Sequence, residues 1–418
     1  MHSKLKMKKL LDNAIVKNIL WLISEKLYFV ILIFFGEGLI SRTLGVNDYG
    51  KWIYSLNIII IISSVALIAG SEVMVPALSK NKKLAGELIT SAFIIRFSGA
   101  LLSFLVLNIY SLVLVNDLVI QHMLLSLSLV LLFNEPFGAI TNYFQAKIDM
   151  KKVVLARCLS LALRTIFVLV AFKIFESNLI YFSRASESIL LALILSLLLY
   201  KSKIRLNFSK KVFLIVLKRG CLLWVPLISM MIYLRIDRFF VEKYFSYETL
   251  AMYGVAVQFI EQAFLLLVIV IQTISPKYIF QSMPKKTMLK NIKLISLLLI
   301  MLVFMMQVFC LFFLKSIITI VYGDSYIQAA TLAISLLPSL LFYAVDTILM
   351  QVFYKYRNNK AILTKWISMM FFSCAMYYIW FDLLSKSNVT MVFNINYLTM
   401  SVITFVLFRR GLKDCKND

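Results

Sequence analysis

Apolar runs of about 20 residues, each long enough to cross a bilayer as an α-helix, follow one another along almost the whole chain. Twelve can be traced, at residues 18–40, 52–71, 88–110, 118–136, 153–175, 178–200, 221–243, 254–275, 292–314, 328–352, 361–382 and 391–409. Hydrophobic residues make up 61% of the chain and charged residues 15%, which is far from the composition of a soluble domain. The sequence therefore predicts an all-α polytopic membrane protein with about twelve transmembrane helices.

The 44 Lys and Arg residues are distributed unequally between the two sets of loops that connect these runs. Most lie on the side that holds the N-terminus, the loop at 201–219 and the C-terminal tail. The opposite side holds only Arg42, Lys51, Lys173, Lys243, Lys315 and Lys386. Because short cytoplasmic loops collect cations, we expect both termini to be cytoplasmic. The net charge of +24 follows from this bias and from attraction to anionic lipids, so it does not indicate nucleic-acid binding.

The basic loop at 201–219 separates two parts with six apolar runs each. We expect an N-terminal six-helix lobe at 1–200 and a C-terminal six-helix lobe at 220–418. Both parts contain a Trp, a Tyr-Gly pair and a Pro in the same order, namely Trp21, Tyr49-Gly50 and Pro76, then Trp224, Tyr253-Gly254 and Pro276. Chance recurrence at membrane interfaces is one explanation. The other is a pair of parallel repeats, which in transporters enclose a central cavity between two lobes.

Within the seventh apolar run, residues 222–241 carry three charged residues, Arg235, Asp237 and Arg238, where a bilayer-spanning helix tolerates few. On a continuous helix Arg235, Arg238 and Glu242 share one stripe, and Asp237 lies with Tyr233 on nearly the opposite face. An ion pair between Arg238 and Glu242 would account for part of this pattern. Arg235 lies one turn deeper, so we expect it to face a polar cavity.

Further cations inside apolar runs include Lys26, Arg96 and Arg164. The planar guanidinium group matches the oxygens of phosphate, so a cationic interior predicts an anionic, phosphate-bearing substrate. The predicted substrate-binding residues are Arg96, Arg164, Arg235 and Arg238, assisted by Lys26. Snorkelling to the interface and ion pairing are the alternatives for individual cations, and Arg184 and Glu187, three residues apart, are expected to neutralise each other.

The acidic residues expected to be buried inside apolar runs are Glu25, Glu37, Glu135, Asp237, Glu261 and Asp346. A carboxylate in a cavity of low dielectric constant can bind and release a proton or a small cation. Glu25, Asp237, Glu261 and Asp346 are therefore candidates for coupling transport to H⁺ or Na⁺. The alternative is that each of them neutralises an interior arginine.

The sequence gives little evidence for an enzymatic site. The only histidines are His2 and His122, there is no phosphate-binding glycine loop, and the five cysteines lack metal-ligand or disulfide spacing. We expect a protein that is not an enzyme and that holds no metal or organic cofactor.

Three stretches of the chain form a recognisable pattern. The first, 18–52, contains "NILWLISEKLYF" and "SRTLGVNDYGKW". The second, 226–261, contains "PLISMMIYLRIDRFF" and "MYGVAVQFIEQ", and the third, 320–334, is "IVYGDSYIQAATLAI". Together they resemble the Wzx-type flippases for O-antigen and capsule repeat units, within the multidrug/oligosaccharidyl-lipid/polysaccharide exporter superfamily. The sequence departs from the family pattern at Lys51 and in "RFFVEKYF", which affects the detail of the substrate.

The resemblance implies a multi-pass protein of a bacterial inner membrane. It would move undecaprenyl-pyrophosphate-linked oligosaccharide from the cytoplasmic to the outer leaflet by alternating access, with interior arginines holding the pyrophosphate. Expected partners are this lipid-linked oligosaccharide and membrane lipids, with a polysaccharide polymerase and a chain-length regulator as further candidates.

Two other functions are weighed against this one. A drug or metabolite antiporter of the same superfamily would share the twelve spans and two lobes, but an exporter of cationic drugs favours acids over arginines in its cavity. A membrane polysaccharide polymerase normally needs a large external loop, and every exported loop of the predicted topology is short.

Overall fold

The computed structural model describes residues 14–147, 149–174, 177–281, 284–356, 358–383 and 388–414, and almost all of them are helical. The first half forms α2 (Ala14–Ser63), η1 (Ser64–Ala69), α3 (Ser71–Lys80), η2 (Lys82–Leu84), α4 (Ala85–Leu114), α5 (Leu118–Phe133), α6 (Gly138–Ala146), α7 (Met150–Ile174), α8 (Ser177–Tyr181) and α9 (Ser183–Lys201). The second half forms α10 (Lys210–Tyr233), α11 (Ile236–Tyr244), α12 (Tyr247–Ser275), η3 (Pro276–Phe280), α13 (Lys285–Tyr322), η4 (Asp324–Tyr326), α14 (Ile327–Leu336), α15 (Ser339–Lys355), α16 (Asn359–Tyr378), η5 (Ile379–Leu383) and α17 (Val389–Asp414). No strand occurs among these residues, so the prediction of an all-α membrane protein is confirmed.

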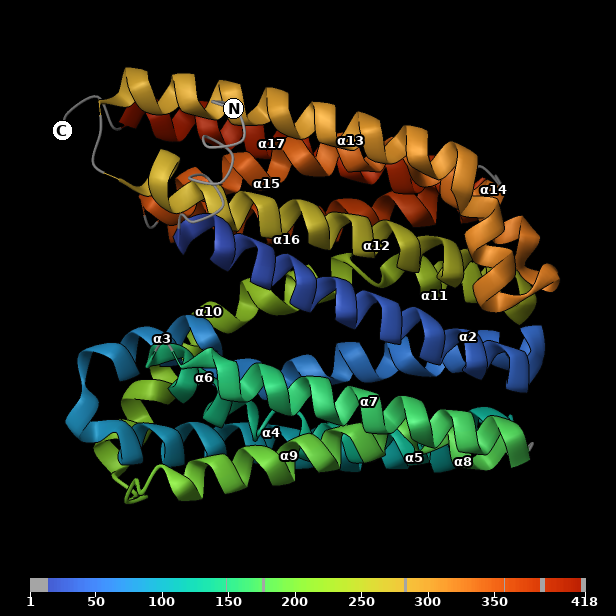
Figure 1. Ribbon diagram of the computed structural model, residues 1–418, viewed down its shortest axis with the longest axis horizontal. Helices are drawn as coiled ribbons and strands as arrows, with labels where there is room; N and C mark the ends of the chain where they lie inside the picture. Colours follow the sequence, from blue (N-terminus) through green and yellow to red (C-terminus); the bar gives the residue numbers. More distant parts are fainter. Residues whose placement is uncertain are drawn as a thin grey trace, which may run out of the picture.

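Helix α2 reverses direction at Gly45, where the backbone has φ 74° and ψ 173°. Trp52 follows Glu37 by 15 residues, yet its Nε1 donates a hydrogen bond to Glu37 Oε2 at 3.3 Å. In a continuous helix about 22 Å of rise would separate these residues. Helix α2 therefore consists of two antiparallel arms, before and after Gly45 (Figure 1).

The number of membrane passes follows from this reversal. Within the described ranges, ten helices are long and apolar enough to cross a membrane, and an eleventh is the pair Asp324–Leu336 and Ser339–Lys355, bent by 51°. The first of the ten, Lys26–Lys80, has 55 residues and supplies both arms of α2. In Figure 1, α2 begins and α17 ends at the same end of the bundle, which requires an even number of passes. Ten to eleven candidate spans are found in the described ranges, and the predicted number of about twelve is reached if the two arms of α2 are counted separately.

Replacing Gly45 with Ala is expected to destabilise the protein by about 1–3 kcal/mol, because a positive φ with an extended ψ is essentially restricted to glycine. Gly36 supplies a matched control in the same helix, since a methyl group there would meet only Thr165 Oγ1, at 4.0 Å. Thermal unfolding of both variants in detergent measures the difference. Equal melting temperatures would show that the reversal does not depend on glycine.

Two groups of helices make up the described part of the chain, α3 to α9 and α11 to α17, with α2 and α10 reaching both (Figure 1). The second arm of α2 and α12 approach closely. A methyl group at Gly50 would overlap the carbonyl oxygen of Tyr247, and one at Gly254 would overlap the side chain of Ile53. Because small residues let membrane helices pack at short range, the Tyr-Gly pair of each half lies at the contact between the groups.

Candidate functional site

A polar cavity of about 240 Å³ lies between the two groups of helices, where α2, α9, α11 and α12 meet. Its charged lining residues are Glu37, Arg184, Arg235, Arg238 and Glu261. These three arginines and two carboxylates give the lining a net charge of +1. A larger cavity of about 880 Å³, between α4, α6 and α9, is lined mainly by apolar side chains and contains none of the predicted site residues.

Glu37 organises the charges contributed by the first half of the chain. Its Oε1 accepts hydrogen bonds from Arg164 Nη2 at 2.8 Å and from Arg184 Nη2 at 2.6 Å. Its Oε2 lies 3.3 Å from Trp52 Nε1 and 3.4 Å from the hydroxyl of Tyr49. One carboxylate thereby connects both arms of α2 with α7 and α9.

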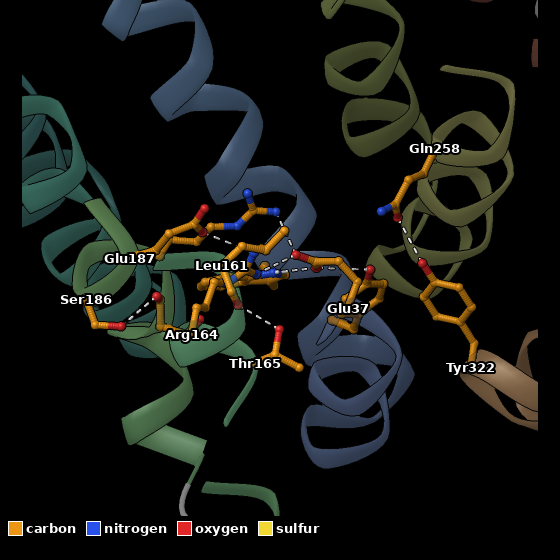
Figure 2. A network of polar contacts seen from close by, with 12 residues as sticks. Glu37, Leu161, Arg164, Thr165, Ser186, Glu187, Gln258 and Tyr322 are labelled. Carbon is orange, nitrogen blue, oxygen red and sulfur yellow. Dashed lines mark hydrogen bonds and ion pairs between the residues drawn. The ribbon is translucent and has the colours of Figure 1, made fainter. Parts of the chain in front are cut away.

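Glu187 provides a second carboxylate partner for Arg164. Figure 2 shows Arg164 and Glu187 on one side of Glu37, and Gln258 and Tyr322 on the other. Glu187 Oε2 lies 3.4 Å from Arg164 Nη1. We expected Arg184 and Glu187 to pair with each other along α9. Instead Arg184 binds Glu37 on α2, and Glu187 binds Arg164 on α7.

Glu261 has the corresponding position in the second half. Its Oε1 lies 2.7 Å from Arg238 Nη2 and 3.2 Å from Arg235 Nη1. Asp237 Oδ1 lies 3.6 Å from Nη1 of the same Arg238, and Asp237 Oδ2 accepts a hydrogen bond from the hydroxyl of Tyr253 at 2.8 Å. Each half thus presents one carboxylate bound by two guanidinium groups to the same cavity.

A break in the seventh span brings these arginines into place. Helix α10 ends at Tyr233 and α11 begins at Ile236, so the continuous helix that we expected is wrong. Arg238 Nη1 donates to the carbonyl oxygen of Leu234 at 2.8 Å, which satisfies a backbone group released by the break. Arg238 binds Glu261 instead of Glu242, and Glu242 accepts a hydrogen bond from Tyr247.

The structure thus brings Arg235, Arg238 and Glu261 together in the cavity lining. Arg164 is not a lining residue, but it binds Glu37, which is one. Arg96 is placed elsewhere. It is buried between α4 and α6, where Nε donates to the carbonyl oxygen of Ala69 at 2.9 Å and Nη1 to that of Glu135 at 3.1 Å. It caps the end of η1, and it is not among the lining residues of the cavity.

Lys26 and Asp346 are not among the lining residues of the cavity. Lys26 Nζ lies over the ring of Phe29, 5.8 Å from its centre. Asp346 is buried in the second half against Lys365, whose Nζ contacts both carboxylate oxygens at 2.6 and 2.7 Å. The side chain of Glu25 lies outside the described residues.

Sequence reasoning did not assign Glu37 and Arg184 to the site. Both lie inside apolar runs, which was a usable signal for a buried charge, but their partners are 127 and 147 residues apart in the chain. A spacing of a few residues in the sequence cannot predict such long-range pairs.

Comparisons with known proteins identify the fold. No family model and no curated protein matches this sequence. Among solved structures, an inward-facing multidrug resistance MATE family transporter of the MOP superfamily aligns with a TM-score of 0.71 and 11% identity, covering 94% of this chain and 96% of its own. The lipid II flippase MurJ, in an inward closed conformation, aligns with a TM-score of 0.69 and 17% identity, covering 94% of this chain and 87% of its own.

A third similar structure is a MOP superfamily transporter from Pyrococcus furiosus, described as having a binding pocket of reverse polarity. It aligns with a TM-score of 0.65 and 11% identity, covering 93% of this chain and 95% of its own. The chain is therefore a multi-pass membrane protein with the fold shared by MATE transporters and the flippase MurJ.

Proposed function

We propose that this protein is a flippase that moves an undecaprenyl-pyrophosphate-linked oligosaccharide, such as an O-antigen or capsule repeat unit, across a bacterial inner membrane. The observation that carries the proposal is the meeting of Arg184 from the first half with Arg235 and Arg238 from the second around one cavity. The sequence resemblance to Wzx-type flippases and the fold shared with the lipid II flippase MurJ support it.

The charges of the cavity suit the head of such a lipid. Guanidinium groups bind phosphate oxygens through paired N–H donors, and these bonds are strong because both partners are charged. At about 30 Å³ for each water molecule, a volume of about 240 Å³ corresponds to roughly eight waters. That space suits a pyrophosphate with an adjoining sugar, and the isoprenoid tail would stay in the bilayer.

In this proposal residues 1–200 and 220–418 move as two lobes, both termini face the cytoplasm, and the cavity opens to each leaflet in turn. Asp237 and Glu261 are the coupling candidates closest to the substrate. Asp346 already has a permanent cation in Lys365. A polymerase and a chain-length regulator would receive the product in the outer leaflet.

Export of a drug or metabolite is the second candidate, because the fold is also that of multidrug transporters. A cationic drug would meet the net charge of +1 in the cavity lining and would be repelled. An anionic metabolite would not, and the accumulated intermediate separates this case from a flippase.

Replacing Arg235 with Gln is expected to reduce surface polysaccharide at least tenfold, because one charge-assisted hydrogen bond to the substrate contributes about 1.5–3 kcal/mol. The assay uses a bacterial strain whose own repeat-unit flippase gene is deleted, at matched protein levels. Arg235 is suited to this test, since Glu261 keeps Arg238 as a partner at 2.7 Å. The missing polysaccharide should appear as lipid-linked repeat units in the cytoplasmic leaflet.

The matched control is Lys243→Gln on α11, the helix that directly follows Arg235; it removes a cation whose side chain is 60% exposed and outside the cavity lining. Its export should equal that of the wild type. Unchanged export by Arg235→Gln, or a normal level of lipid-linked intermediate in cells without the protein, would refute the proposal.

A further inference from the structure

The cavity contains amide side chains that the charged residues do not use. Asn57, on the second arm of α2, is 3% exposed, and its Nδ2 has no hydrogen-bond partner among the described residues. Gln262, on α12, likewise has an Oε1 that is buried without a partner in the part of the chain described. Both residues line the cavity.

These two atoms have opposite hydrogen-bonding requirements. Asn57 Nδ2 is a donor and Gln262 Oε1 is an acceptor. Buried polar groups are almost always paired, and leaving one unpaired costs free energy, so two such atoms on residues that line one cavity indicate a ligand that pairs with them. Arg184 Nε, in the same lining, is a further donor without a partner among the described residues.

Their position places them beside the arginines. Asn57 lies four and eight residues after Ile53 and Tyr49, so all three lie on one face of the second arm of α2. Gln262 directly follows Glu261, the carboxylate that holds Arg235 and Arg238. A group bound to the amides would therefore adjoin an anion bound to the guanidinium groups.

The pairing of one donor with one acceptor distinguishes between ligand classes. Phosphate oxygens only accept, so a phosphate alone would leave Gln262 Oε1 unpaired. An apolar drug would leave both amides unpaired. A sugar hydroxyl donates and accepts. We propose that Asn57 and Gln262 bind hydroxyl groups of the sugar that adjoins the pyrophosphate, and so determine specificity; this inference rests on the proposed function.

The test measures binding of defined lipids to the purified full-length protein in detergent. The probes are undecaprenyl pyrophosphate alone and the same lipid carrying one hexose or one N-acetylhexosamine. The wild type should bind at least one sugar-bearing probe about tenfold more tightly than the bare lipid. Asn57→Leu and Gln262→Leu should each abolish this difference and leave the affinity for the bare lipid unchanged.

Asn142→Leu is the matched control. Asn142, on α6, is 5% exposed with an Nδ2 that lacks a partner among the described residues, and it is not part of the cavity lining. This variant should keep the full difference between the probes. Neither Asn→Leu change should lower the melting temperature without ligand, since each removes an unpaired buried amide. If Asn57→Leu unfolds, Asn57→Ala, which adds no bulk to the cavity, replaces it.

The two proposals fail in different ways. Equal affinity of the wild type for all probes, or loss of the sugar preference in Asn142→Leu, overturns the role of the amides and leaves the flippase proposal standing. If the wild type binds none of the lipids, both are overturned.

Discussion

Replacing Glu37 with Gln is expected to lower the free energy of unfolding by about 3–5 kcal/mol, because the buried guanidinium group of Arg164 and the partly exposed one of Arg184 lose the carboxylate that they share. Arg164 exposes only 3% of its side chain, so water cannot take the place of that carboxylate. The amide keeps the size of the side chain, which assigns the effect to charge. Chemical denaturation in mild detergent, followed by helical circular dichroism, measures the change.

Glu187→Gln is the matched control for this variant. Glu187 binds the same Arg164, but at 3.4 Å and with 26% of its side chain exposed. Partly exposed pairs contribute about 0–1 kcal/mol, so the control should stay close to the wild type. Equal losses in the two variants would show that Glu37 has no special role in joining α2, α7 and α9.

Helical periodicity placed Arg235 and Arg238 on one stripe of the seventh span. Both arginines line the polar cavity. The same periodicity could not reveal the break between Tyr233 and Ile236, because Leu234 continues the apolar pattern through it. The partner of Arg238 therefore became Glu261 on α12 instead of Glu242 one turn away.

The Tyr-Gly pair present in each half indicated equivalent positions, and the tyrosines of the two pairs make similar hydrogen bonds. Tyr49 donates to Glu37 at 3.4 Å, and Tyr253 donates to Asp237 at 2.8 Å. In both halves the tyrosine reaches back to a carboxylate on the helix segment before it. The order of residues in the sequence suggested equivalent positions, but the two acids lie at different distances from their tyrosines along the chain, so no fixed spacing identifies them.

Arg96 shows a limit of reading charge from sequence. A cation deep inside an apolar run was expected to face a substrate, but its donors are taken by the carbonyl oxygens of Ala69 and Glu135. The carbonyl of Ala69 lies at the end of η1, and that of Glu135 lies in the turn after α5, where it also accepts a hydrogen bond from Gly138 N at 3.2 Å. A backbone carbonyl at a helix end can accept hydrogen bonds from a guanidinium group, just as an anionic ligand can. The apolar pattern does not reveal where helices end, so it does not reveal such carbonyls.

Lys365 and Asp346 should behave as a structural pair rather than as an ion-coupling site. Replacing Lys365 with Met is expected to lower the free energy of unfolding by about 3–5 kcal/mol, because Asp346 would be left charged and buried. Lys365 has no exposed side-chain surface and contacts both oxygens of Asp346, which also accepts a hydrogen bond from Thr404. Denaturation in detergent measures the loss, and Lys152→Met, in the exposed pair with Asp149, should change stability by less than about 1 kcal/mol.

The double variant Lys365→Met with Asp346→Leu distinguishes the two roles. Replacing both members of a buried ion pair with apolar residues is often neutral, so most of the stability lost in the single variant should return. If the pair only holds α15 and α16 together, export by the double variant should follow the amount of folded protein. If Asp346 instead carries the coupling ion, the double variant would be stable and inactive, because no carboxylate remains to bind H⁺ or Na⁺. The ammonium group of Lys365 already satisfies this carboxylate at 2.6 and 2.7 Å, and a second cation would have to displace it, so we expect stability and export to recover together.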